Sequence, residues 1–135
     1  MRNEDIRHDP ALVQKYCLLV MSVLPIETVR VFLFNSAGRL MREFKRQKGA
    51  VNRLSCDILE IILESKNMTQ KMPRSFLVLA RNHPGGNHNP SSADFELSRQ
   101  CVVALQPQNT TLLEHLIVSS QGLASAMPEG RPLTS

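Results

Sequence analysis

Cysteine and large aromatic residues are scarce in this sequence. Its 135 residues include no tryptophan, one tyrosine and three cysteines. The cysteines, at positions 17, 56 and 101, are odd in number and widely spaced, and no two form a Cys-x-x-Cys pair. Neither a disulfide framework nor a zinc ribbon is therefore expected. Each cysteine has apolar neighbours with helical spacing and is interpreted as a small core residue.

Long apolar runs are also missing. The stretch over residues 16–24 is too short to span a bilayer, and the chain does not begin with a basic and apolar leader followed by a cleavage site. We therefore expect a cytoplasmic protein with no membrane partner.

The composition is that of a globular protein, with 42% apolar and 21% charged residues and neither a low-complexity tract nor an internal repeat. A chain of this length has the usual size of a single domain and can bury a core. We expect one domain over residues 10–130, preceded by a lead-in at 1–9 and followed by a tail at 131–135.

Basic residues exceed acidic ones, which gives a formal charge of +4. Such a charge permits acidic partners without requiring them. Arg42, Lys45 and Arg46 are the candidate nucleic-acid contacts, in a basic cluster that also contains Arg39, Lys48 and Arg53. The segment lacks interleaved aromatic residues and no nucleic-acid motif accompanies it, so a solvated face is the favoured interpretation.

Hydrophobic spacing in the first half predicts a helix, a hairpin and a second helix. The first helix begins at Asp9-Pro10 and stops at Pro25, and strands at 28–34 and 39–45 flank a glycine-bearing turn. Ser55 is predicted to cap a helix that runs to about Lys66. The expected buried positions are Leu12, Tyr16, Leu19 and Val23 in the first helix and Ile58, Leu59, Ile62 and Leu63 in the second.

The second half alternates strand and helix. A polar loop is expected at 67–75, and the unbroken apolar run 76–80 predicts a central strand that is covered on both faces. A helix then begins at Ser91, and residues 112–118 form a last long strand. The apolar stripe of that helix is expected to contain Phe95, Val102 and Leu105.

Residues 81–94 have a spacing that suggests a metal site. If 76–83 form a strand, side chains 81 and 83 share one face, and the helix after Pro90-Ser91 can bring Asp94 back toward them. Catalytic zinc usually takes three protein ligands and one water. Arg81 cannot serve as a ligand, because its guanidinium has no free lone pair and stays protonated. Only His83 and Asp94 remain.

Residues 81–86, together with Pro90-Ser91 and Asp94, resemble the His-Asn-His-Pro-Ser-Gly, Pro-Ser and Asp signature of RadC-like proteins in the JAB/MPN (JAMM) metallopeptidase superfamily. The resemblance covers roughly residues 10–130. It implies an α/β fold, a mixed sheet flanked by helices in the JAB/MPN (cytidine-deaminase-like) arrangement. Further similar segments lie at 27–35, 36–40, 48–50, 113–118 and 125–130.

The sequence departs from the family pattern at Arg81, where the signature has histidine, at Gly85 in place of serine and at Ala50 in place of threonine. The link at 66–75 is also several residues longer. The resemblance implies that Glu27 is the general base, that His83 and Asp94 are zinc ligands and that Ser91 is a polar helper near the reacting carbonyl.

With Arg81 at the third ligand position, we expect an impaired centre with no bound zinc, in a module that binds a protein or peptide. Our hypothesis is that Arg81 pairs with Asp94 or Glu27. Two alternatives stay open: an active zinc peptidase or isopeptidase with His88 as the replacement ligand, and a DNA-associated accessory protein that uses the basic hairpin. Either a monomer or a homodimer is consistent with the sequence.

Several of these residues also have simpler interpretations. Ser91 and Asp94 fit a helix capping box. His83 is expected to hydrogen-bond to nearby backbone, His88 to lie in a surface loop and His115 to be a core residue.

Overall fold

The computed structural model describes residues 10–47 and 54–127, with three α-helices, one short 3-10 helix and five strands in these ranges. In chain order they are α1 (Pro10–Met21), β1 (Thr28–Asn35), β2 (Leu40–Gln47), α2 (Leu54–Thr69), β3 (Ser75–Asn82), α3 (Ser92–Leu105), η1 (Gln106–Gln108), β4 (Thr110–Ser119) and β5 (Gly122–Ser125).

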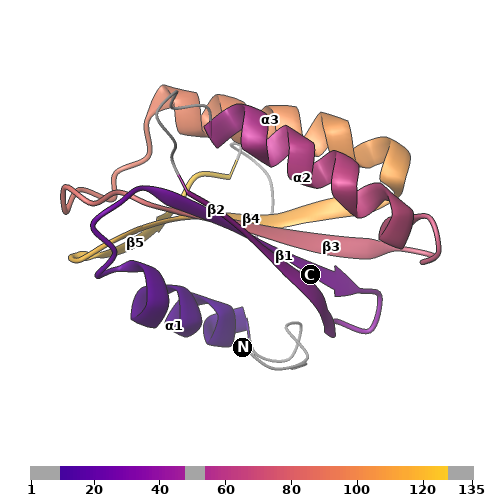
Figure 1. Cartoon of the computed structure of the whole chain (residues 1–135), viewed down its shortest axis with the longest axis horizontal. Coiled ribbons are helices and arrows are strands. Elements are labelled where there is room, and N and C mark those ends of the chain that lie inside the picture. The colour runs from indigo at the N-terminus through magenta and orange to yellow at the C-terminus, as the bar shows by residue number, and fades with distance from the viewer. Residues whose placement is uncertain (1–9, 48–53, 128–135) are drawn as a thin grey trace.

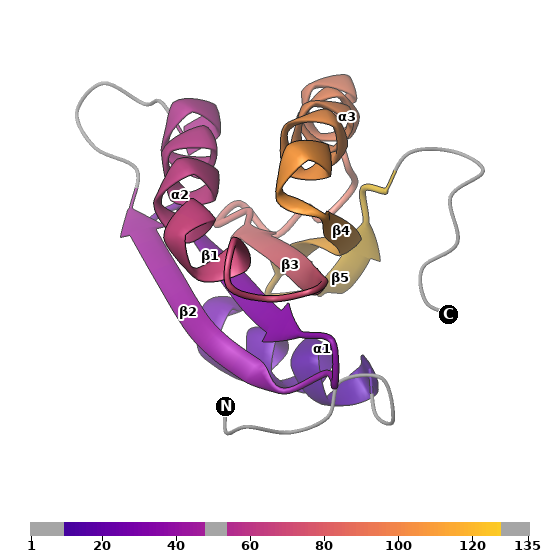
Figure 2. The same ribbon diagram turned by 90° about the vertical axis from the view of Figure 1, so that its right-hand side faces the viewer.

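The five strands form one mixed sheet in the order β2-β1-β3-β4-β5. Only β3 and β4 are parallel, and the crossover between them is α3, as a parallel pair requires. α1 covers one face of the sheet, while α2 and α3 lie side by side on the other (Figures 1 and 2). The expected single α/β domain with a mixed sheet between helices is therefore confirmed.

The sheet separates two apolar cores. On the α2 and α3 face, Val31, Leu79 and Ile61 belong to one buried cluster. On the α1 face, Phe32, Val78 and Cys17 belong to the other. Successive residues of β1 and β3 thus point into different cores, which confirms that 76–80 is a central strand covered on both faces.

The predicted buried stripe of α1 is wrong at Leu19 and Val23, although Tyr16 is partly buried against the core. Leu19 and Val23 are 80% and 78% exposed, whereas Val13, Cys17 and Met21 are buried at a spacing of four residues. The helix ends at Met21, before Pro25, so Val23 lies beyond it. Because most residues of α1 are apolar, several sets of residues with helical spacing could form the buried stripe, and spacing alone does not identify the correct set.

The predicted faces of α2 and α3 are confirmed in part, since Ile58, Ile62 and Leu105 are buried as expected. Ile61 is buried in place of Leu63, which is 69% exposed, and Leu59 is exposed as well. In α3 the fully buried apolar residues are Leu97, Cys101 and Leu105, while Phe95 and Val102 are only partly covered.

The polar loop expected at 67–75 starts too early, because α2 continues to Thr69. The hydroxyl oxygens of Thr69 and Ser65 both lie 3.2 Å from the side-chain oxygen of Gln108, and each hydroxyl is also within hydrogen-bond distance of a backbone oxygen of α2. These bonds satisfy polar side chains on the buried side of the last turn, so the helix continues where composition predicts a loop.

β5 was not predicted. It is four residues long and pairs with β4 after a tight turn in which Gly122 has φ +142°, a conformation that favours glycine. Segments this short carry too little alternation to be recognised.

The predicted lead-in, the segment 48–50, the basic residues Lys48 and Arg53, and the predicted tail lie outside the described residues, as does the side chain of Cys56. Cys17 and Cys101 are buried, as predicted. In the described ranges, every helix is too short or too polar to cross a lipid bilayer.

Candidate functional site

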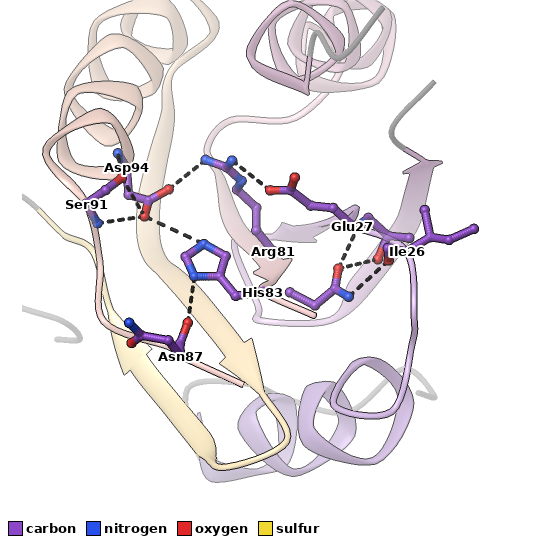
Figure 3. Close-up of polar contacts among 9 residues, drawn as sticks. Ile26, Glu27, Arg81, His83, Asn87, Ser91 and Asp94 are labelled. Atoms are coloured by element: carbon purple, nitrogen blue, oxygen red, sulfur yellow. Dashed lines mark hydrogen bonds and ion pairs between the residues drawn. The ribbon is translucent and has the colours of Figure 1, made fainter. Parts of the chain in front are cut away.

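Three segments meet at one end of the sheet. β1 runs antiparallel to β3 with Val29 opposite Arg81, so Glu27, just before β1, lies beside the end of β3. The crossover after β3 returns the first turn of α3, which contains Asp94, to the same end. The predicted convergence of Glu27, Arg81, His83 and Asp94 is therefore present (Figure 3).

Arg81 bridges the two acids. Its Nη1 donates to Asp94 Oδ1 at 2.8 Å, and its Nη2 donates to Glu27 Oε2 at 3.3 Å. The exposed side-chain fractions are 15% for Arg81, 20% for Glu27 and 3% for Asp94. Arg81 is thus predicted correctly to pair with these carboxylates, and it pairs with both.

Asp94 uses its two oxygens differently. Oδ1 accepts from Arg81, while Oδ2 accepts from the backbone N–H of Ser91 at 2.8 Å and from its hydroxyl at 3.0 Å. Ser91 and Asp94 form the predicted capping box at the start of α3. Burial raises the pKa of Asp94, but the Ser91 backbone bond, the Arg81 charge and the Ser91 hydroxyl together bring it below its ordinary value.

His83 keeps a defined orientation. Its Nδ1 lies 2.9 Å from the backbone oxygen of Asn87, which only accepts, so Nδ1 carries the proton. Nε2 is left facing Asp94 Oδ2 at 3.8 Å. The expected bond to nearby backbone is confirmed, and it is the same kind of bond that orients metal-ligating histidines.

Asn82 holds the segment that carries Glu27. Its side-chain oxygen accepts from the backbone N–H and the hydroxyl of Thr28, at 2.6 and 2.9 Å. Its amide nitrogen donates to the backbone oxygens of Leu24 and Ile26, at 3.4 and 3.1 Å. Strand alternation turns Asn82 away from Arg81 and His83, so this fully buried side chain ties the α1–β1 connection to β3.

His115 lies behind the site, fully buried on β4. Ser98 Oγ lies 2.6 Å from the Ala126 carbonyl and 2.7 Å from His115 Nδ1. Because a hydroxyl has one proton and the carbonyl only accepts, Nδ1 donates to Ser98 and Nε2 is unprotonated. Among the described residues, His115 Nε2 and Arg81 Nε are buried without a hydrogen-bond partner.

Burial, followed by the nearby Arg81 charge, lowers the pKa of His115 to about 3. This ring is therefore a neutral core residue, as predicted, but its position next to the Arg81 cluster was not foreseen. A histidine inside an otherwise apolar strand is the sequence feature that indicates a buried ring. Its closeness to Arg81 follows from the register of β3 and β4, in which Arg81 lies opposite Ile117.

His88 and the basic residues lie elsewhere. His88 bonds through Nδ1 to the Ser119 hydroxyl at 2.9 Å, beside Gly122 of the β4–β5 turn. Arg42, Lys45 and Arg46 are on β2, where Arg42 stacks on the Phe44 ring at 4.3 Å and Arg46 pairs with Glu64. A nucleic-acid role for these three stays a prediction.

The donor atoms do not fit a catalytic zinc ion. Within residues 10–47 and 54–127, no group of three His, Cys, Asp or Glu side chains is arranged to hold a metal. His83 and Asp94 lie close to each other, but the adjoining side chain is Arg81, whose guanidinium bonds to Asp94 and Glu27 and cannot bind a metal. The zinc-ligand roles of His83 and Asp94, and the catalytic roles of Glu27 and Ser91, stay predictions.

Comparison with known proteins gives one consistent result. Residues 7–131 match the RadC-like JAB domain family. The chain is 25% identical over 133 residues to a UPF0758 protein of Shewanella pealeana, covering 96% of this chain and 56% of that protein. It is 27% identical over 121 residues to a UPF0758 protein of Bordetella avium, covering 90% of this chain and 52% of the relative. The chain thus spans little more than half the length of these relatives.

Proposed function

This chain belongs to the RadC-like JAB domain family, and from that premise we propose that it is a binding module in which an arginine salt bridge has replaced the metal centre of zinc hydrolases. Its partner in this proposal is a protein or peptide. The observation that carries the proposal is the pair of bonds from Arg81 to Asp94 and Glu27.

Arg81 opposes a metal through its charge. It stands where the resembling signature has a histidine, and its guanidinium stays protonated at any relevant pH. A fixed positive charge at about 4 Å disfavours each unit of metal charge by roughly 1 to 4 kcal/mol, depending on screening. The loss of one lone-pair donor out of three weakens binding further.

Arg81 also forms hydrogen bonds to the two carboxylates that zinc-dependent hydrolysis would need. Glu27 would have to accept a proton from an activated water, yet its Oε2 accepts from Arg81. Asp94 has one oxygen on Arg81 and the other on Ser91. With both oxygens engaged, Asp94 serves the fold: it caps α3 and neutralises Arg81.

Retention of the acids follows from the cost of burying charge. A buried carboxylate without a partner is strongly destabilising, and an arginine is well suited to pair with two of them because its Nη groups point in different directions. In this proposal Arg81 preserves the local structure around the two acids while it removes the conditions for hydrolysis.

Zinc titration by calorimetry tests this proposal in three forms of the chain: unmodified, Arg81→His and Arg81→Gln. We expect no site tighter than the micromolar range in the unmodified chain, because Arg81 is charged. Arg81→Gln removes the charge without adding a strong donor, so it separates electrostatic blocking from the missing ligand. A gain of zinc binding in Arg81→His alone identifies the ligand as the deciding factor, whereas stoichiometric binding by the unmodified chain contradicts the proposal.

A further inference from the structure

β2 is an edge strand that exposes a methionine and two basic side chains. In the described part of the chain, β1 is the one strand that pairs with it, and the sheet order ends at β2. Figure 2 shows β2 along the rim of the sheet, next to α2. The outer side of such a strand presents backbone N–H and C=O groups that another extended segment can pair with.

The exposed charges along this edge are positive. Arg42 and Lys45 are exposed, and the Arg42 guanidinium lies over the Phe44 ring, which fixes its position. Glu43 is the one acidic residue of β2, and Arg30 and Tyr16 already bond to it on the α1 face. In the part of the chain that the structure describes, the ion pairs of β2 involve Glu43 and Arg46. Arg42 and Lys45 therefore present positive charge to an incoming strand, one from each face of β2.

A methionine pocket adjoins the beginning of β2. The pairing of β1 with β2 shifts register between Leu33 and Phe34, which leaves Met41 out of the ladder and half-exposed. The pocket has a volume of about 270 Å³ and is almost wholly apolar, with a lysine in its lining. Its lining residues are Met41, Asn67, Met68, Lys71 and Met72. Methionine side chains adapt readily to an inserted apolar group.

A second copy of the same strand does not suit this edge. Two β2 strands side by side would bring Arg42 and Lys45 close to one another, and like charges on opposed strands are destabilising. The bulge at Met41 also interrupts a regular ladder. The complementary occupant is an extended segment with acidic side chains and one apolar anchor.

We propose that the β2 edge, defined as the backbone of residues 42–47 with Arg42, Lys45 and the methionine pocket, binds an acidic extended peptide of a partner protein by strand addition. The peptide extends the sheet, its acidic side chains pair with Arg42 and Lys45, and an apolar residue enters the pocket. The inference rests on the binding role proposed above and names the surface and the partner's chemistry. Because this surface is separate from the Arg81 site, it does not depend on whether zinc binds.

Fluorescence anisotropy with a labelled peptide tests this directly. The probe, labelled with fluorescein at its N-terminus, is Leu-Thr-Glu-Val-Thr-Asp-Val-Thr-amide, and two matched peptides accompany it. Its two acids are three residues apart and so lie on opposite faces of an extended strand, as Arg42 and Lys45 do on β2. One carries N-methyl groups on alternate backbone amides, which removes N–H donors and keeps the charge; the other has lysine at all acidic positions. We expect the N-methylated peptide to bind about tenfold or more weakly, as the loss of roughly two hydrogen bonds implies, and the lysine peptide not to bind.

Variants locate the binding surface. Arg42→Glu with Lys45→Glu should weaken binding of the acidic probe by about tenfold or more, because attraction becomes repulsion. Met41→Glu should do the same through the pocket. The double variant Lys15→Glu with Arg99→Glu makes the same change in net charge away from β2 and should leave affinity within about twofold.

Three results would overturn the inference: equal binding of the probe and its N-methylated form, equal weakening by the two double variants, or no binding by the folded unmodified chain. Binding of a 20-base-pair DNA duplex that the β2 variants abolish, with no binding of the peptide, would assign the edge to nucleic acid instead. Circular dichroism of each variant shows whether it is folded.

Discussion

The two oxygens of Asp94 bind different partners, so Asp94 forms the predicted capping box with Ser91 and the predicted ion pair with Arg81 at the same time. The capping box with Ser91 is predictable from a serine followed three residues later by an acid, because it depends on local helix geometry. The bond to Arg81 joins residues 13 apart in sequence. It was predicted through the family resemblance, since no local pattern carries that contact.

Asp94→Asn should reduce the free energy of unfolding by about 1 to 3 kcal/mol at pH 7, because Arg81 loses a charged partner while an amide can still accept at the cap. The folded-state pKa of Asp94 is lowered, so its contribution is complete above the unfolded pKa of about 3.9 and is lost as pH falls through the lower folded value. Urea unfolding between pH 7 and pH 3 should show the difference from the unmodified chain shrink below about pH 4.

Glu96→Gln is the matched control for that variant. Glu96 is on the same helix, is exposed and pairs with exposed Arg99, so its replacement should change stability by no more than about 0.5 kcal/mol. A pH-independent effect of Asp94→Asn, or an equal effect of Glu96→Gln, would contradict the assigned role of Asp94.

His115 should stay neutral throughout the physiological range. Its pKa is lowered to about 3 by burial and by Arg81, against about 6.5 in an unfolded chain. NMR of the imidazole ring should show no titration from pH 8 to pH 5, with the proton on Nδ1; in urea the same ring should titrate near its ordinary value. As pH falls below about 6.5, the unfolded chain takes up a proton that the folded chain does not, so stability falls. Ring titration near pH 6 in the folded protein would refute this placement.

At the scale of elements, the connection between α1 and β1 depends on one side chain of β3. Asn82 is fully buried and makes two hydrogen bonds to this connection and two to Thr28, the first residue of β1, so it fixes the position of Glu27 between them. The sequence contains Asn82 inside the 81–86 motif, but alternation directs it to the face opposite Arg81 and His83. A pattern of metal ligands on one face of β3 therefore does not include Asn82, the residue that positions the segment containing Glu27.

Asn82→Ala should lower the free energy of unfolding by about 2 to 4 kcal/mol, because it leaves several buried backbone groups without partners. Hydrogen exchange should also become faster at the Thr28 amide, which donates to Asn82. Asn89→Ala is the control: Asn89 is exposed on the loop before α3, and its replacement should be nearly neutral. Equal stability of the two variants would show that the hydrogen bonds of Asn82 do not stabilise the fold.

Strand positions were more predictable than helix faces, and the reason is physical. β1, β3 and β4 each contain a short run of consecutive apolar residues, which indicates a buried strand whatever it packs against. α1 and α2 carry more apolar residues than one face can bury, so the tertiary contacts choose the stripe. β5 depends on a turn at Gly122 and on a neighbouring strand, neither of which its four residues specify.

For the whole molecule, the sheet order places the Arg81 site at one end of β3 and the basic edge along β2, so two sites with different chemistry share one domain. At the Arg81 site the charged side chains bond to one another, since Arg81 is paired with both Glu27 and Asp94. β2 retains exposed positive charge. In our account, the Arg81 site stabilises the fold of the binding module, and the exposed β2 edge is the surface that binds the partner.

Elemental analysis of the purified, unmodified chain, expressed with ample zinc and dialysed without chelator, tests the central claim most directly. Because Arg81 is charged and already bonds to both acids, we predict far less than one zinc ion per chain, and the same low content in an Asp94→Asn variant. One zinc ion per unmodified chain that is lost in both His83→Ala and Asp94→Asn would contradict the account.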